Sequence, residues 1–154
     1  MENKNLKPLK PLKSLIFLDS NYWIYLFDQT TEEHAIIKEH FASIYDKYHL
    51  ASNTVVLLET LHYLVKRLGS ELVKEKWDWF MAMDLAIDEL TLPCIDATFD
   101  EHLKYSHTGI GGRDASILAS MKRLGDIRTL VSHDRDFLNI PEIAVIDPIV
   151  DHVK

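Results

Sequence analysis

The sequence predicts an α/β fold in three layers (α/β/α), with a central parallel sheet between two layers of helices. Short apolar runs alternate along the chain with longer helical segments, which is the pattern of parallel strands joined by crossover helices. The run at residues 15–18 is uniformly apolar, as expected for a strand buried on both faces. With 154 residues, 47% of them apolar, the chain has the size and composition of one domain with its own core.

The boundaries of the expected elements follow from apolar runs, capping residues and glycines. Strands are expected at residues 15–18, 49–52, 90–93, 129–131 and 144–146. Helices are expected at residues 22–27, 32–45, 55–68, 70–86, 97–105 and 113–124. Residues suited to cap the first three helices are Ser20 and Asn21, Thr30 and Thr31, and Asn53 and Thr54. Gly69 and Gly125 end the third and the last of these helices.

Residues 1–13 are expected to form a flexible basic tail. Lysines alternate there with Pro8 and Pro11, and no apolar signal-peptide segment precedes Ser14. Residues 14–154 are expected to form a single domain. We expect no membrane span, because the chain has no continuous apolar stretch of sufficient length. Its single cysteine, Cys94, fits the reducing cytoplasm.

The charge of the chain argues against a protein that coats nucleic acid nonspecifically. Acids outnumber bases by 24 to 17, which gives a formal net charge of −7, whereas such proteins usually carry a basic surface. The excess of acids is compatible with a nuclease that gathers carboxylates in one metal site.

Two acidic residues directly follow predicted strands. Asp19 comes after the run at 15–18, and Asp134 lies just beyond the run at 129–131, with Asp136 two residues further on. A helix cap or a turn would explain either acid alone. Because the carboxyl ends of parallel strands share one edge of a sheet, we expect Asp19 and Asp134 to converge there.

Two further acids lie in predicted helices. Glu59 has apolar neighbours on both sides in VVLLETLHYLV, where a carboxylate is unfavourable unless it is paired or binds a metal. The alternative is a narrow polar stripe with Thr60 and His62. Asp114 begins a helix after two glycines, where an acid complements the helix dipole. Small residues on that helix favour close packing on the sheet: Ala115, Ser116, Ala119 and Ser120.

Convergence of these acids would have a specific chemical use. Carboxylates that meet without a counterion repel one another and raise the pKa of at least one member. Oxygen ligands suit Mg²⁺ or Mn²⁺, and such an ion activates a bound water and stabilises the charge on a phosphodiester under attack.

With these residues, the chain resembles the PIN-domain ribonucleases, and among them the VapC-type toxins of toxin–antitoxin systems. The resemblance extends from about residue 14 to residue 146. Asp19 in FLDSN matches the strand that ends in Asp, and Glu59 in VVLLETLHYL matches the helical Glu. Asp114 in GGRDASILAS matches the Asp that begins a helix rich in small residues. The last motif is matched by LVSHDRDF, with Ser132, Asp134, Asp136 and Phe137.

The resemblance implies an endoribonuclease that depends on Mg²⁺ or Mn²⁺ and has a single PIN-like nuclease domain over residues 14–154. The catalytic and metal-binding acids would be Asp19, Glu59, Asp114 and Asp134, with Asp136 as a further metal ligand. Asn21 and Ser132 would orient ligands or a water. Ser132 stands where threonine is commoner, which leaves open whether Asp134 or Asp136 is the fourth ligand. Arg113 and Arg135 are candidate contacts to RNA.

The resemblance also implies partners. Toxins of this class pair with a small antitoxin whose tail enters the acidic pocket, and they often form homodimers. An arginine or lysine from the partner would suit carboxylates that lack a counterion.

Other functions remain open from the sequence. The chain would also suit a PIN-fold RNA-processing nuclease or a catalytically silent module that binds RNA or protein. A haloacid-dehalogenase-like phosphatase would need a second Asp at position 21, which is Asn21 here. A di-iron site hinted at by Glu59 and His62 would need a second Glu-x-x-His motif, and none is present.

Overall fold

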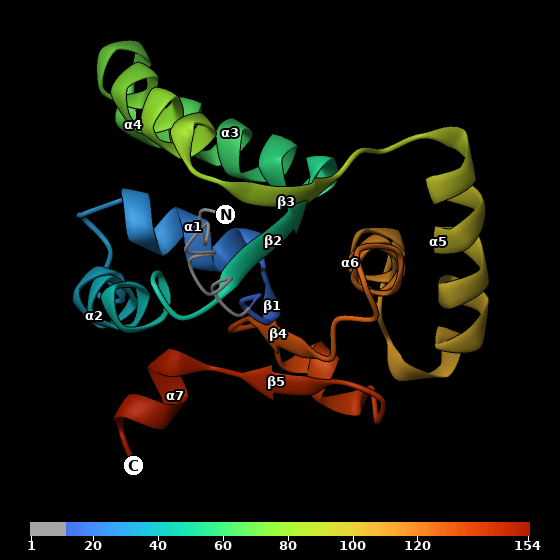
Figure 1. The fold of residues 1–154 in the computed structure, drawn as a ribbon. Helices are drawn as coiled ribbons and strands as arrows, with labels where there is room; N and C mark the ends of the chain where they lie inside the picture. Colours follow the sequence, from blue (N-terminus) through green and yellow to red (C-terminus); the bar gives the residue numbers. More distant parts are fainter. Residues whose placement is uncertain (1–11) are drawn as a thin grey trace, which may run out of the picture.

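The computed structural model of the protein describes residues 12–154, in which helices flank a parallel sheet (Figure 1). The strands are β1 (Leu15–Leu18), β2 (His49–Asn53), β3 (Leu85–Asp88), β4 (Thr129–Val131) and β5 (Ala144–Ile146). The α-helices are α1 (Ser20–Phe27), α2 (His34–Ile44), α3 (Thr54–Leu68), α4 (Ser70–Ala82), α5 (Leu92–Lys104), α6 (Gly112–Arg123) and α7 (Pro148–His152). Two 3₁₀ helices, η1 (Ser106–Thr108) and η2 (Arg135–Asn139), complete the described elements.

The sheet has five parallel strands in the order β3-β2-β1-β4-β5. Phe17 of the central strand pairs with Ala51 of β2 on one side and with Leu130 of β4 on the other. Helices α1 and α2 lie on one side of the sheet, and α6 and α5 lie on the other (Figure 1). The predicted three-layer fold with a parallel sheet is confirmed.

The strand order contains one reversal of direction. The chain builds outward from β1 through β2 to β3 and then crosses back to form β4 on the opposite side of β1. At such a switch point the connections leave β1 and β4 in opposite directions, which opens a crevice at their carboxyl ends. The fold therefore locates the expected ligand site just after residues 18 and 131.

The third strand lies earlier in the chain than predicted. Residues 85–88 form β3, with Leu85 paired to Leu50, so the helix expected over residues 70–86 ends at Ala82. The strand expected at residues 90–93 is wrong, because those residues lead into α5.

Helix α5 begins at Leu92, five residues before the predicted start. Thr91 caps it by accepting a hydrogen bond from the backbone N–H of Cys94. Pro93 lies in the first turn, where a missing N–H is tolerated and the fixed φ suits a helix. The Thr-Leu-Pro segment is thus a helix start.

The predicted cap of the second helix is also wrong. Helix α2 begins at His34 after Glu33, and Thr30 instead donates its backbone N–H and its hydroxyl to Asp28, at 3.0 and 2.6 Å. Of the predicted basic tail, residues 1–11 lie outside the described residues. Among the helices of residues 12–154, none has the length and apolarity that crossing a membrane requires.

Aromatic side chains from α1 and α4 form the centre of the core beneath one face of the sheet. Trp23 is fully buried, with its ring centroid 4.5 Å from that of Phe80 and 6.3 Å from that of Phe27. Truncation of a buried tryptophan to alanine typically lowers the free energy of unfolding by about 3–5 kcal/mol. This packing fixes α1, and with it the turn that follows β1.

A buried carboxylate joins α1 to α3. The Asp28 side chain has no exposed surface, and it accepts hydrogen bonds from Thr30 and from the hydroxyl of Tyr63 at 3.0 Å. Arg67 Nε lies 3.6 Å from the same carboxylate. Burial by itself would raise the pKa of Asp28, but the hydrogen bonds from Thr30 and Tyr63 and the charge of Arg67 lower it below the ordinary value.

We predict that Asp28→Ala lowers the free energy of unfolding by about 2–4 kcal/mol, because it leaves buried donors without an acceptor. Urea unfolding followed by circular dichroism measures the change. Asp78→Ala is the control, because Asp78 forms only an exposed i,i+4 pair with Lys74 and its loss should change stability by less than about 0.5 kcal/mol. Equal effects of the two substitutions would contradict the assigned role of Asp28.

Candidate active site

Asp19 lies at the switch point, directly after the central strand. Its backbone N–H donates to Val131 O at 3.1 Å, which extends the pairing of β1 with β4 by one residue. Its side chain is fully buried and caps α1, with Oδ1 accepting from Ser20 N at 2.6 Å. Asp19 is therefore the helix cap that its position allows, and its carboxylate also belongs to the cluster described below.

A serine and an asparagine hold the second oxygen of Asp19. Ser132 Oγ donates to Asp19 Oδ2 at 2.7 Å and accepts from the backbone N–H of Asp134 at 3.0 Å. Asn21 Nδ2 lies 3.4 Å from Asp19 Oδ2, and Asn21 Oδ1 accepts from the backbone N–H of His133 at 3.2 Å. These contacts tie the segments after β1 and β4 together, so both residues expected to orient ligands lie beside the acids.

Glu59 reaches the same region from α3, and it is not buried, which was one of the two interpretations that the sequence left open. Its side chain is 42% exposed, and its neighbour Leu58 is 67% exposed. With about 100° of rotation per residue, the buried side of α3 consists of Val56, Leu57, Thr60 and Leu64, and Glu59 falls at its rim. Apolar neighbours in sequence therefore did not mean apolar surroundings in space.

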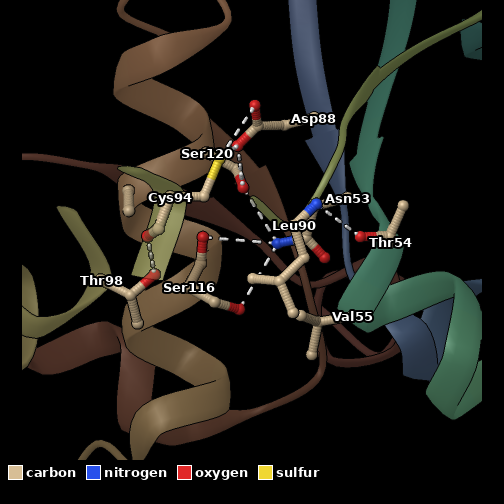
Figure 2. Close-up of a pocket in the computed structure, with 10 residues that line it drawn as sticks. Asn53, Thr54, Val55, Asp88, Leu90, Cys94, Thr98, Ser116 and Ser120 are labelled. Atoms are coloured by element: carbon tan, nitrogen blue, oxygen red, sulfur yellow. Dashed lines mark hydrogen bonds between the residues drawn. The ribbon is translucent and has the colours of Figure 1, made fainter. Parts of the chain in front are cut away.

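Asp114 is the third residue of α6 and is 7% exposed. A buried polar network holds this helix against the carboxyl ends of β2 and β3 (Figure 2). Asn53 Nδ2 donates to Ser120 Oγ at 3.0 Å and to Ser116 O at 3.3 Å, and Ser120 Oγ donates to Asp88 Oδ2 at 2.9 Å. Sequence reasoning treated Asn53 only as a helix cap and missed Asp88, although both are polar residues at strand ends.

The guanidinium of Arg113 joins all four acids. Nη1 lies 2.9 Å from Asp19 Oδ1 and 2.9 Å from Glu59 Oε2. Nη2 lies 2.8 Å from Asp114 Oδ1 and 3.5 Å from Asp134 Oδ2. The four acids therefore converge, and their counterion is part of this chain, whereas the sequence had indicated carboxylates that await a partner's cation. The feature of the sequence that could have indicated this counterion is the basic residue directly before Asp114.

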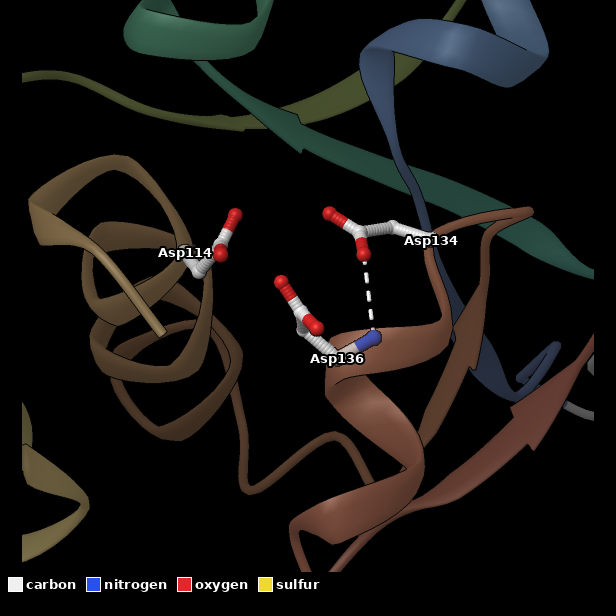
Figure 3. Close-up of side chains that lie close together, drawn as sticks. All are labelled: Asp114, Asp134 and Asp136. Atoms are coloured by element: carbon white, nitrogen blue, oxygen red, sulfur yellow. Dashed lines mark hydrogen bonds between the residues drawn. The ribbon is translucent and has the colours of Figure 1, made fainter. Parts of the chain in front are cut away.

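Asp136 lies at the edge of this cluster. One ligand oxygen from each of Asp114, Asp134 and Asp136 falls within 4.8 Å of the others, and Figure 3 shows the three carboxylates around a common space. Asp134 Oδ1 accepts from the backbone N–H of Asp136 at 3.0 Å. Of the two acids that the sequence left open as the fourth member, Asp134 contacts Arg113, whereas Asp136 is exposed and forms no ion pair with Arg113 among the described residues. Arg135 is exposed and forms no ion pair among the described residues.

The electrostatics of the site reflect crowding of like charges. Burial raises the pKa of Asp114; the charge of Arg113 opposes this, and the charges of Asp134 and Asp19 reinforce it, so that the net shift is upward. Partial burial would lower the pKa of Arg113, but the charges of Asp19 and Glu59 outweigh it and raise this pKa. The cluster therefore retains a demand for positive charge.

The donor set fits a hard divalent cation. The side chains that meet are carboxylates, and their oxygens are the ligands that Mg²⁺ and Mn²⁺ prefer. Asp19 and Asp114 are buried, while Glu59 and Asp134 are partly open to solvent. Such a site would leave room for waters and for a substrate phosphate on its exposed side.

We predict that Asp114 makes the metal-free protein less stable as the pH rises. Its folded-state pKa is above the ordinary value of 3.8, so between these two values the folded state holds more protons than the unfolded state. The contribution of Asp114 to the free energy of unfolding is therefore most favourable below pH 3.8, and this contribution is lost as the pH rises through the folded-state pKa. Urea unfolding in EDTA across this range should show wild type losing stability relative to Asp114→Asn; a relative gain would contradict the assignment.

Solved structures with the same fold are toxins of toxin–antitoxin systems. VapC20 of Mycobacterium tuberculosis, described as a sarcin–ricin loop cleaving toxin, has a TM-score of 0.69 and 20% identity, covering 82% of this chain and 95% of that one. VapBC2 of Rickettsia felis, bound to a promoter DNA fragment, has a TM-score of 0.67 and 19% identity, and the match covers 86% of this chain and 97% of that one. DNA-bound VapBC of Salmonella typhimurium has a TM-score of 0.66 and 21% identity, and the match covers 89% of this chain and 98% of that one.

The sequence itself assigns the family. None of the curated proteins compared with the chain matches it. The family model of the PIN domain, however, matches residues 16–143, which include β1 to β4 and all four acids around Arg113. This match favours the PIN fold over the haloacid-dehalogenase-like phosphatase that the sequence had left as an alternative. The chain belongs to the PIN domain family.

Proposed function

We propose that this protein is an endoribonuclease that depends on Mg²⁺ or Mn²⁺ and acts as the toxin of a toxin–antitoxin pair. The observation that carries the proposal is the convergence of four carboxylates on one guanidinium at the switch point of the sheet. They come from the residue after β1, from α3, from α6 and from the segment after β4. Nucleases of this kind need such a set of acids to hold a metal beside a phosphodiester.

Asp19, Glu59, Asp114 and Asp134 are the proposed metal ligands, and Asp136 is a fifth acid within reach. The bound ion would lower the pKa of a ligated water and stabilise the charge that develops on the phosphate. Ser132 and Asn21 would keep the Asp19 carboxylate in one orientation, because both contact Asp19 Oδ2. Supports of this kind commonly affect metal affinity or activity by about 10- to 100-fold.

An activated side-chain nucleophile is not needed. The nearest hydroxyls, on Ser20 and Ser132, both lie within hydrogen-bonding distance of Asp19 as donors, and neither contacts a described histidine. Cys94 is buried beside Asp88 in the network that holds α6. Attack by a water held over the acids is the chemistry that these residues favour.

The toxin assignment rests on family membership and on the names of the similar structures. Several of these are complexes of a toxin with its antitoxin, and one toxin is described as cleaving the sarcin–ricin loop of RNA. We therefore propose RNA as the substrate, a small antitoxin as the partner and the cytoplasm as the location. An RNA-processing role and a silent binding module are the alternatives that experiment must separate.

We predict that the purified protein cleaves RNA with Mg²⁺ or Mn²⁺ and not with EDTA, and that Asp19→Asn or Asp114→Asn lowers the rate at least about 100-fold. Asp84→Asn is the matched control, since this carboxylate is fully exposed and, among the described residues, pairs only with His49. His49 is the first residue of β2, so this pair lies at the amino ends of the strands, away from the acids. The assay is gel analysis of a mixed RNA pool with folded protein.

Four outcomes would contradict this proposal. Full activity of Asp19→Asn, or cleavage that persists in EDTA, would reject the metal-dependent site. RNA binding without cleavage by folded wild type would favour the silent module. Cleavage without growth arrest on expression in a bacterial host would favour RNA processing over a toxin.

We also propose that the protein is a homodimer that associates through α5. Leu92, Ile95, Phe99 and Leu103 recur every three or four residues on the outer side of this helix, with exposed fractions of 75%, 46%, 60% and 59%. A contiguous apolar strip of this kind is uncommon on a monomer and typical of an interface.

We predict that Phe99→Glu converts the dimer into a monomer, because it would bury a charge at the interface. Light scattering coupled to size-exclusion chromatography measures the mass. Leu138→Glu is the control, since Leu138 is 61% exposed but lies on η2 and is not part of the apolar strip on α5. A wild-type monomer, or a dimer that survives Phe99→Glu, would rule out this interface.

A further inference from the structure

The guanidinium of Arg113 lies where the proposed metal site needs its positive charge. It contacts one oxygen of each of the four acids, at distances from 2.8 to 3.5 Å. Its only other described partner is Ser20 Oγ, at 3.3 Å. Contacts to four acids from four segments show that this side chain is the main counterion of the site.

A divalent ion bound by these acids would compete with this guanidinium. The guanidinium already contacts one oxygen each of Asp19, Glu59 and Asp114, and two cations at such short range repel strongly in a partly buried site. Either cation, by contrast, satisfies the excess negative charge. The two are therefore alternatives.

Arg113 is also able to leave. It is the second residue of α6, its side chain is 31% exposed, and its contacts are made by the tip of a long, flexible chain. Apart from the adjoining residues and the backbone of the helix itself, no heavy atom of the described residues comes within 4 Å of the position that a Cβ would take on Gly111 or Gly112, so open space adjoins the helix start. Rotation of side-chain torsions moves the guanidinium outward without a change in the backbone.

We infer that Arg113 is an internal competitor of the metal, so that the site alternates between an arginine-closed state and a metal-loaded state. This inference rests on the proposed metal-dependent function. In the closed state, the arginine stabilises the acids and lowers the affinity for ions. To bind, a divalent ion must displace the arginine. The site therefore fills with metal at a higher free ion concentration than the acids alone would require.

The test is isothermal titration of Mn²⁺ into wild type, Arg113→Gln and Arg128→Gln. Arg113→Gln should bind Mn²⁺ about 5- to 150-fold more tightly, the usual range of coupling between two binding events. Arg128→Gln is the control, because it removes the same charge from an arginine that pairs with Asp126. Arg128 lies just before β4, at the amino end of that strand and away from the acids, so this variant should bind Mn²⁺ as wild type does. This control separates direct competition from a change in net charge.

Thermal unfolding provides a second readout that does not depend on activity. Without metal, Arg113→Gln should melt at a lower temperature than wild type, because the acids repel without their counterion, and Mn²⁺ should raise its melting temperature by more. If the variant is unfolded in EDTA and folds when Mn²⁺ is added, that also supports competition. Arg113→Lys, which keeps the charge but has a single ammonium in place of the planar fork, should have intermediate affinity.

The outcomes separate this inference from the proposed function. Equal Mn²⁺ affinity of wild type and Arg113→Gln, with binding abolished by Asp19→Asn, would overturn the competition and leave the metal site intact. Weaker binding by Arg113→Gln would overturn it as well, since the arginine would then support the ion. No binding by any folded variant would overturn both the inference and the metal-dependent function.

Discussion

The convergence of like charges at the carboxyl edge of the sheet is the constraint on which the rest of this structure depends. Asp19 and Asp114 are buried, and unpaired buried carboxylates are strongly destabilising. The structure meets this demand with one planar guanidinium, whose geometry allows several carboxylates to be paired at once. The proposed metal site must also be stable without an ion, and the pairing of Arg113 with the four acids meets that requirement.

The topology of the sheet makes that convergence possible. Each of the four acids comes from a different part of the chain, and the reversal of strand order between β1 and β4 opens the space in which they meet. The neighbouring strand ends then serve as supports. Asn53 after β2 and Asp88 at the end of β3 bind Ser120 and so fix the helix that carries Asp114. The edge of the sheet thus provides both the acids and the frame that orients them.

Asp19 shows how one residue serves the fold and the site together. Its Oδ1 caps α1 and receives Arg113, while its Oδ2 receives Ser132 from the segment after β4. The helix cap that the structure shows and the metal ligand that we propose are compatible roles for this carboxylate, because its two oxygens face different neighbours.

The sequence by itself determined the fold class and the acids of the site, because both depend on local patterns. Buried parallel strands require uniformly apolar runs, and the acids follow such runs or begin helices in recognisable segments. The sequence interpretation misplaced β3, since an apolar run after a helix does not show where the helix stops. It also left open whether Glu59 is buried, since neighbours in sequence do not define a helix face. Only the tertiary structure decided that Arg113 neutralises the acids. That contact joins residues up to 94 positions apart, and an arginine at a helix start has no local signal that distinguishes an inward from an outward side chain.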